Sequence, residues 1–354
     1  MPKVSLFFPH DHKENHVKAL DGLRGLAVLL VLFDHLSRNN LWLPVNFFDM
    51  GKIGVYLFYM LSAYLLDKQI IDVMVANKND SSYWKYYFFR RFVRIYPLFI
   101  ISLFLYYFIS EYYMQDFIPS LKIIMHHLLL QKGRLMYWSI PVEFKYYFFS
   151  PVLLWFFKQH HWRSEIVISV LLALILLASI CNFVIPDILS TINFLAPFLI
   201  GTLFAYLEKF HPHINYQKMK SFIFLCVAVL ALGLPYYWYT YLDIYLPFNN
   251  FDGILLVSFI LSGIFIGARY SFLKKIFQWK PLRFIGNISF SLYLLHFAVL
   301  NFFRTYNPGE PYWNSLFTIT GSILLATISY LILELPLSKL KLRKRYKTGI
   351  ITKD

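Results

Sequence analysis

The sequence predicts an all-α membrane protein, a single bundle of about ten transmembrane helices with the N- and C-termini in the cytoplasm. Its composition is the first reason: of 354 residues, 58% are hydrophobic and only 15% are charged, whereas charged residues make up about a quarter of soluble domains. The second reason is a series of apolar runs of about 20 residues, the length that crosses about 30 Å of hydrocarbon. Because lipid offers the backbone no hydrogen bonds, spans of this kind fold as helices.

The apolar runs define the expected organisation of the chain. We expect spans at residues 19–36, 53–73, 95–113, 138–157, 165–185, 190–208, 221–241, 251–268, 285–303 and 314–334. The shorter run 120–131 is too short to span and is expected in the interface or as a re-entrant segment. The first run follows polar residues and precedes no small-residue cleavage pattern, so it predicts a retained helix. The chain thus divides into a cytoplasmic segment 1–18, a ten-helix domain 19–336 and a basic cytoplasmic tail 337–354.

The third reason is the distribution of basic residues, which also predicts the orientation. The chain has 34 Lys and Arg against 19 Asp and Glu, a formal charge of +15. With the N-terminus inside, 25 of the 34 fall in cytoplasmic segments, as basic residues of membrane proteins do. They are scattered between apolar runs and form no stripe, so the charge indicates a membrane surface and not a nucleic acid. The tail from Lys341 to Lys347 is either a topology signal alone or a contact with anionic lipids.

The first run carries four ionisable residues, and such residues inside a span are candidates for function. They are Asp21, Arg24, Asp34 and His35. Arg24 and His35 are eleven residues apart, which places them on nearly the same helix face and about 16 Å apart along the axis. Glycines near Arg24 would let a neighbouring helix or a ligand approach closely. A polar helix end with a satisfied buried histidine explains the pattern equally well.

The fourth run begins with WSIPVEF, which places Glu143 one or two turns inside the outer surface, at roughly the depth of His35. A histidine can take a proton from a hydroxyl, and a nearby carboxylate can orient its ring. His35 and Glu143 are therefore a candidate general base and its helper. Adjacent helix residues do not share a face, so Asp34 is not assigned as the partner of His35. Tyr137 is interpreted as an interfacial aromatic residue.

Arg91 and Arg94 stand three residues apart in FFRRFVRIYP, at the inner end of the third run. Guanidinium groups match phosphate oxygens in geometry and charge. Cytoplasmic anchoring by positive charge explains the two arginines as well. Phosphate binding is therefore one of two interpretations of this pair.

Other polar residues within the runs have simpler interpretations. His296 and Tyr293 lie on a similar face of the ninth run, where a structural hydrogen bond is the default. Glu334 ends the last run, and pairing with a loop arginine is the simplest account of it. Lys68 and Lys145 lie near span ends and can extend their amines to the interface, so neither is assigned a role. The two cysteines in the sequence have no spacing typical of a disulfide framework or a metal site, and no metal is expected.

Several segments, taken in order, resemble the membrane acyltransferase family 3, the integral-membrane O-acyltransferases of bacterial surface polysaccharides. The matching segments are ALDGLRGLAVLLVLFDH, GKIGVYLFYMLSAYLL, RRFVRIYP, WSIPVEFKYYFFSP, ISFSLYLLH and YLILELP. They include arginine, ten intervening residues and histidine in the first helix, here Arg24 and His35, and the Arg-x-x-Arg and Trp-Ser-x-x-x-Glu elements. Together they extend from about residue 18 to 336. Because the chain ends soon after the tenth run, we expect no additional hydrolase-like domain of the kind that some relatives carry.

The resemblance implies an acyltransferase of groups other than aminoacyl groups, most often an acetyl-CoA-dependent O-acetyltransferase. It would act as a multi-pass protein of the bacterial cytoplasmic (inner) membrane. Acetyl-CoA would be a co-substrate, with no permanently bound cofactor. The acceptor would be a hydroxyl of a surface polysaccharide or lipid-linked glycan on the outer side, with lipopolysaccharide O-antigen as the first expectation. Membrane lipids are the other expected partners, nucleic acid is not expected, and the oligomeric state stays open.

The resemblance also implies roles for individual residues. His35 would remove the acceptor's proton, or accept the acyl group transiently, with Glu143 in support. Direct transfer and an acyl-histidine intermediate stay open. The phosphates of the donor would bind Arg24, Arg91 and Arg94. The acyl or acceptor pocket would include Ser62, Trp138, Ser139, Tyr293 and His296.

A transporter or flippase of a lipid-linked sugar or small anionic substrate is the alternative function. Intramembrane arginine, histidine and glutamate also suit a substrate or proton path. Many secondary transporters contain internal repeats, and the two halves of this sequence show none. The acyltransferase interpretation is therefore preferred.

Overall fold

The computed structural model describes residues 7–8, 11, 16–39, 47, 50–113, 117–184, 189–232, 253–306 and 311–340. Within these residues the chain is helical and contains no strand, which confirms the predicted all-α class. The basic tail from Lys341 to Lys347 lies outside the described residues, as do most of the N-terminal segment and the end of the predicted run 221–241.

Over the described residues, each of the ten predicted apolar runs coincides with a helix, except the ninth, which two helices share. These helices are α1 (Lys18–Arg38), α2 (Met50–Val75), α3 (Ser81–Tyr113), α5 (Ser139–Gln159), α6 (Ser164–Val184), α7 (Leu195–Phe210), α8 (Lys220–Leu232), α10 (Ile254–Tyr270), α13 (Ser289–Tyr306) and α14 (Pro311–Ser329). The short run 120–131 contains α4 (Leu121–Leu128), whose first turn is capped by the Ser120 side chain. The largest difference in length is in α3, which begins 14 residues before the predicted span.

Only some of these helices are long and apolar enough to count as spans by themselves. Within the described residues they are Ser81–Tyr112, Ser164–Asn182 and Tyr312–Ser338, with a fourth if a bent helix pair forms one span. Helices such as α1 carry charged residues inside the bundle, and these residues lower the mean hydropathy. Among the described residues the structure therefore shows three helices, or four with the bent pair, that are long and apolar enough to cross a membrane.

The predicted ninth span, 285–303, is not one straight helix. It is divided between α12 (Lys280–Asn287) and α13, which meet at an angle of 77°. The short α11 (Lys274–Phe277) precedes them. At the other end of the chain, α14 continues through a π-helical turn (Tyr330–Glu334) into α15 (Leu335–Ser338).

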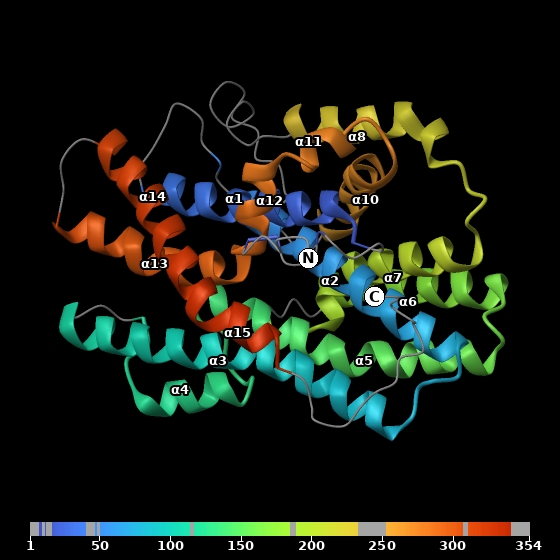
Figure 1. Cartoon of the computed structure of the whole chain (residues 1–354), viewed down its shortest axis with the longest axis horizontal. Helices are drawn as coiled ribbons and strands as arrows, with labels where there is room; N and C mark the ends of the chain where they lie inside the picture. Colours follow the sequence, from blue (N-terminus) through green and yellow to red (C-terminus); the bar gives the residue numbers. More distant parts are fainter. Residues whose placement is uncertain are drawn as a thin grey trace, which may run out of the picture.

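Figure 1 shows α2 crossing the middle of the molecule, with α13 and α14 on one side and α6 and α7 on the other. α2 packs against α1, α5 and α7, while α1 also packs against α12. The predicted close approach at glycines in α1 is confirmed. A Cβ atom on Gly22 would lie 2.0 Å from the carbonyl oxygen of Phe277, and one on Gly25 would lie 2.1 Å from that of Leu282. Only glycine permits α1 to approach this backbone so closely.

Candidate active site

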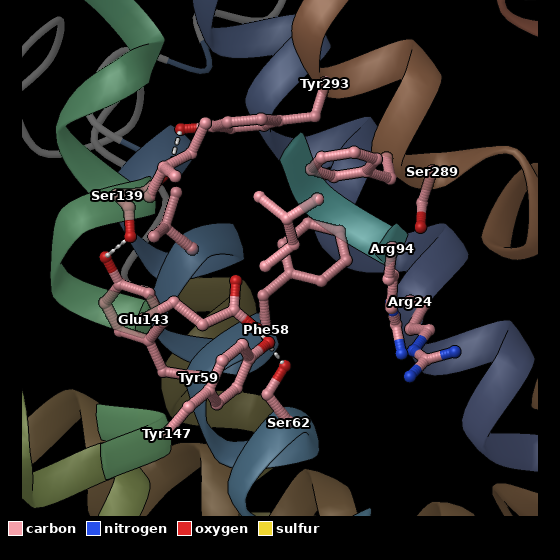
Figure 2. A pocket seen from close by; sticks show the side chains of 14 residues that line it. Arg24, Phe58, Tyr59, Ser62, Arg94, Ser139, Glu143, Tyr147, Ser289 and Tyr293 are labelled. Carbon is pink, nitrogen blue, oxygen red and sulfur yellow. Dashed lines mark hydrogen bonds between the residues drawn. The ribbon is translucent and has the colours of Figure 1, made fainter. Parts of the chain in front are cut away.

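A cavity lies between α1, α2, α3, α5 and the start of α13 (Figure 2). It holds about 640 Å³ of atom-free space, a figure that includes its open mouth. It is lined by Arg24, Val55, Phe58, Tyr59, Ser62, Arg94, Ile95, Ser139, Ile140, Glu143, Tyr147, Ser289, Phe290 and Tyr293. The structure thus brings together six of the predicted site residues, from five helices that are distant in sequence.

Glu143 projects into the cavity from the first turns of α5 and is held by two hydroxyl groups. Ser62 Oγ on α2 and Tyr147 Oη on α5 each donate a hydrogen bond of 2.6 Å to its Oε1 atom. Hydrogen bonds to a charged acceptor are stronger than neutral ones, so the carboxylate has a defined position. Sequence reasoning missed Tyr147, although its spacing of four residues from Glu143 places the two side chains on one face of the helix.

Ser139 and Tyr293 form one end of the cavity. The Tyr293 hydroxyl donates to the carbonyl oxygen of Met136 at 2.7 Å and lies 2.9 Å from Ser139 Oγ (Figure 2). The predicted pocket residue Trp138 does not line the cavity. Its ring packs against Phe194, with 5.2 Å between centroids, so its role is to support the neighbouring wall.

Arg24 and Arg94 form the opposite end of the cavity. Figure 2 shows their guanidinium groups next to each other, on the side away from Ser139 and Glu143. Neither group has an ion pair or a hydrogen-bond acceptor among the described residues, although Arg24 is largely buried. A charge that is partly withdrawn from water is normally paired, so the unpaired Arg24 makes this end of the cavity a candidate site for an anion.

Arg91, which the sequence grouped with Arg94, does not line the cavity. Its guanidinium carbon lies 5.7 Å from the ring centroids of both Tyr87 and Tyr147. It therefore stands behind Tyr147, which does line the cavity. The two arginines of the Arg-x-x-Arg element consequently have different surroundings.

His35 lies beyond the cavity and pairs with His296. His35 Nδ1 is 2.7 Å from His296 Nε2, and His296 Nδ1 is 3.0 Å from the carbonyl oxygen of Leu292. The ring of Tyr293, a cavity residue, is 6.5 Å from that of His296. The two histidines therefore adjoin the Tyr293 end of the cavity, and the His35 side chain retains 20% of its surface exposed.

The expected pairing of His35 with Glu143 is not present in the structure. Glu143 is bound to Ser62 and Tyr147, deeper in the cavity, whereas the hydrogen-bond partner of His35 is another histidine. Reasoning from depth along a helix places residues at a level of the membrane but does not fix which helices face each other. Asp34 is also no hydrogen-bond partner, since its carboxylate lies 4.0 Å from His35 Nε2.

Three other residues differ from their simplest interpretation. Lys68 does not extend to the interface, because its amine binds Glu208 at 2.5 Å. Glu334 does not pair with a loop arginine. It accepts hydrogen bonds from the backbone N–H and the hydroxyl of Ser291, at the start of α13. Lys145 donates to the carbonyl oxygen of Leu189 at 3.0 Å.

Asp11, His16 and Asp21 form the one group of described residues whose spacing could hold a metal ion. Arg283 already binds both carboxylates, with 3.3 Å to Asp21. Although burial raises the pKa of Asp11, its hydrogen bond and charge interaction with Arg283 hold that pKa below the ordinary value. A guanidinium group thus neutralises this cluster, and the donor set does not fit a metal ion.

Comparisons with known proteins identify the family of the chain. A family model described as an acyltransferase domain matches residues 17–334. A peptidoglycan O-acetyltransferase of Listeria monocytogenes is 25% identical, with a match that covers 93% of this chain and 57% of the relative. A putative peptidoglycan O-acetyltransferase of Bacillus subtilis is 26% identical, over 92% of this chain and 56% of the relative.

An O-acetyltransferase of Staphylococcus aureus is 24% identical, over 93% of this chain and 58% of the relative. The chain therefore spans somewhat more than half the length of these relatives. No solved structure matches the chain. The family match over residues 17–334 shows that this chain belongs to acyltransferase family 3, the membrane family that its motifs resemble.

Proposed function

We propose that this protein is a membrane O-acetyltransferase that moves an acetyl group from cytoplasmic acetyl-CoA to a hydroxyl of a cell-surface polysaccharide. The observation that carries the proposal is the cavity itself. One end holds two guanidinium groups that have no partner among the described residues, and the other end adjoins the His35–His296 pair. An anionic donor can bind at the first end while its acyl group reaches toward the second.

The donor end suits a coenzyme A thioester. Arg24 and Arg94 supply charged donors for phosphate groups. The walls between the two ends are mostly apolar, with Val55, Phe58 and Ile140 among them, and suit the uncharged pantetheine arm. The rise of α1 from Arg24 to His35 is about 16 Å, a distance that an extended arm of this kind can cover. Acetyl-CoA is then a co-substrate, and no permanent cofactor is required.

The proposed orientation places Arg24 near the cytoplasm and His35 near the outer surface. It is supported by the ten apolar runs of the sequence, whose described parts are helical, and by the basic residues, most of which then lie inside. This multi-pass arrangement in the bacterial cytoplasmic membrane brings donor and acceptor to one site from opposite sides. The acceptor hydroxyl would approach the exposed part of the His35 ring.

In the proposed reaction, His35 takes the proton of the acceptor hydroxyl as its oxygen attacks the thioester carbonyl carbon. The new C–O bond forms, the C–S bond breaks, and the coenzyme A thiolate takes the proton from the imidazolium. A route through an acetyl-histidine uses the same residues in two steps. Glu143 does not contact His35 and acts on the cavity side, where it orders Ser62 and Tyr147.

The acceptor is a surface polysaccharide. The names of two relatives point to peptidoglycan, and lipopolysaccharide O-antigen is the acceptor first expected from the sequence. The test uses the purified protein in lipid nanodiscs, with acetyl-CoA labelled in the acetyl group and either glycan as acceptor. Label that appears as an alkali-labile ester on a glycan supports the proposal and identifies the acceptor. If no ester forms on any glycan while the protein transports unmodified lipid-linked sugar across liposomes, the protein is a transporter.

A further inference from the structure

We propose that His296 is a positioning residue that fixes the tautomer of His35, so that the Nε2 atom of His35 is the base. This inference rests on the proposed acetyltransferase function and deepens it. It starts from a hydrogen-bond chain of three groups in sequence, His35, His296 and the carbonyl oxygen of Leu292. Each group in this series determines which nitrogen of the neighbouring ring carries the hydrogen.

The proton positions in this hydrogen-bond series follow from its last member, the carbonyl oxygen of Leu292, which can only accept a hydrogen bond. The carbonyl oxygen of Leu292 lies 3.0 Å from His296 Nδ1, so this nitrogen carries the hydrogen. A neutral imidazole has one N–H and one acceptor nitrogen, which makes His296 Nε2 the acceptor. His35 Nδ1, at 2.7 Å from it, must then be the donor. The lone pair of neutral His35 is consequently on Nε2.

The opposite assignment would place two lone pairs against each other. If His296 Nε2 donated to His35, a neutral His296 would turn an unprotonated Nδ1 toward the Leu292 oxygen at 3.0 Å. A doubly protonated His296 would avoid this contact, but the residue is only 1% exposed and has no carboxylate partner among the described residues. Burying an unpaired charge is costly, so the neutral form is favoured.

The surroundings of His35 fit a base at Nε2. The nearest carboxylate to this atom is that of Asp34, at 4.0 Å, which is too far for a hydrogen bond. Asp34 in turn accepts a hydrogen bond from Arg38 at 3.0 Å, so its charge is already balanced. Within the described part of the chain no hydrogen bond occupies Nε2, and the side chain is partly exposed. This nitrogen is therefore available to an acceptor hydroxyl.

A partner on Nδ1 is the usual way to hold a catalytic histidine in the correct tautomer and orientation. Here the partner on Nδ1 is the neutral ring of His296, which itself donates to the carbonyl oxygen of Leu292, and not a carboxylate. When His35 takes up a proton at Nε2, its Nδ1–H still donates to His296, and this bond becomes charge-assisted. The pair therefore stabilises the protonated state without moving.

Two substitutions of His296 separate positioning from packing. His296→Gln can place its amide oxygen near the position of Nε2 and accept from His35, whereas His296→Leu cannot. We expect His296→Leu to lower kcat for acetyl transfer about 100-fold, the size of a general-base contribution, with an unchanged KM for acetyl-CoA. His296→Gln should retain kcat within about tenfold of the unmodified protein.

His127 provides a matched control. It is a buried histidine on α4 whose Nδ1 also contacts the carbonyl oxygen four residues earlier, that of Ile123, at 2.8 Å. It does not line the cavity and does not contact His35. We expect His127→Leu to leave kcat per folded molecule unchanged, because it removes the same kind of local hydrogen bond without affecting His35.

A spectroscopic measurement on the unmodified protein does not depend on how the variants fold. The protein is labelled with ¹⁵N-histidine in lipid, and the His35 signals are assigned by their loss in His35→Ala. We expect a protonated Nδ1 and an unprotonated Nε2 in His35 at neutral pH. A protonated Nε2 would overturn the inference, as would equal kcat values for His296→Leu and His296→Gln in folded protein. If the unmodified protein transfers no acetyl group at all, the proposed function fails, while the spectrum still reports on the histidine pair.

Discussion

Replacing Arg24 by glutamine removes one of the two cations at the donor end of the cavity while keeping a polar side chain of similar length. Arg24 has no anionic partner among the described residues and is largely buried. Its neighbour Arg94 lines the same cavity but is exposed. The two guanidinium groups therefore differ in how much water competes with a bound phosphate, and this difference sets the expected effects.

The size of each effect follows from burial. A hydrogen bond to a charged group away from water contributes about 1.5–3 kcal/mol, and each 1.4 kcal/mol is a factor of ten in affinity. We therefore expect Arg24→Gln to weaken the binding of coenzyme A about 10- to 100-fold. An exposed ion pair contributes about 0.2–1 kcal/mol, so Arg94→Gln should weaken binding about fivefold at most.

Titration calorimetry with coenzyme A measures these affinities directly, because the product binds without turnover. Arg90→Gln is the matched control. Arg90 lies on the same helix as Arg94 and donates to the carbonyl oxygen of Ser338 at 2.6 Å, but it does not line the cavity. Its loss should leave the Kd unchanged. An unaltered Kd for folded Arg24→Gln, or an equal loss for Arg90→Gln, would refute the assignment of the donor end.

Three further substitutions test the packing that holds the site. Gly25→Ala would place a Cβ atom 2.1 Å from the carbonyl oxygen of Leu282, so we expect the free energy of unfolding to fall by about 1–3 kcal/mol in thermal unfolding. Gly321→Ala is the control and should be tolerated, because its nearest contact is a side-chain tip at 3.0 Å. Equal melting temperatures for the two variants would contradict this packing. Asp67→Ala removes an acceptor shared by the hydroxyls of Tyr146, Ser150 and Thr202. Thr202 can still donate to the carbonyl oxygen of Phe198 and Tyr146 to Thr202, so the main loss is at buried Ser150, and we expect a cost of about 1–3 kcal/mol by the same measurement. An unchanged melting temperature would show that this network is not stabilising. Lys68→Ala breaks the ion pair with the partly buried Glu208, so it should lower the melting temperature but leave kcat per folded molecule unchanged. A lower kcat would show that this ion pair affects the active site.

The sequence predicted the helices well because their cause is local. A run of about 20 apolar residues in lipid has to form a helix, and the described parts of the ten runs are helical, with a break only in the ninth. The bend between α12 and α13 has no such local signal. The bend depends on the close fit of Gly286 to α1, where a Cβ atom would lie 1.8 Å from the backbone carbonyl oxygen of Asp21. It also depends on the hydrogen bonds that Ser291 donates to Glu334. These contacts join distant parts of the chain.

In the candidate site, too, some features could be predicted from the local sequence, whereas contacts between distant helices could not. Arg24 and Glu143 could be selected from the sequence because ionisable side chains are rare in spans, and Ser62 was implied by the family resemblance. The structure places all three in one cavity. The partner of His35 could not be selected, because several polar residues lie at a similar depth and the sequence does not give the rotation of each helix. His296 looked like an ordinary buried histidine until its contact with His35 was visible.

The central claim is that His35 is the group that activates the acceptor. It is tested most directly by the O-acetyl content of the surface glycans, measured by NMR, in cells whose only copy of this gene carries His35→Ala. Membrane insertion is checked in parallel by the amount of protein in the membrane fraction. We expect the O-acetyl signals to disappear while the protein remains inserted in normal amounts. Normal O-acetyl content in these cells would contradict the mechanism.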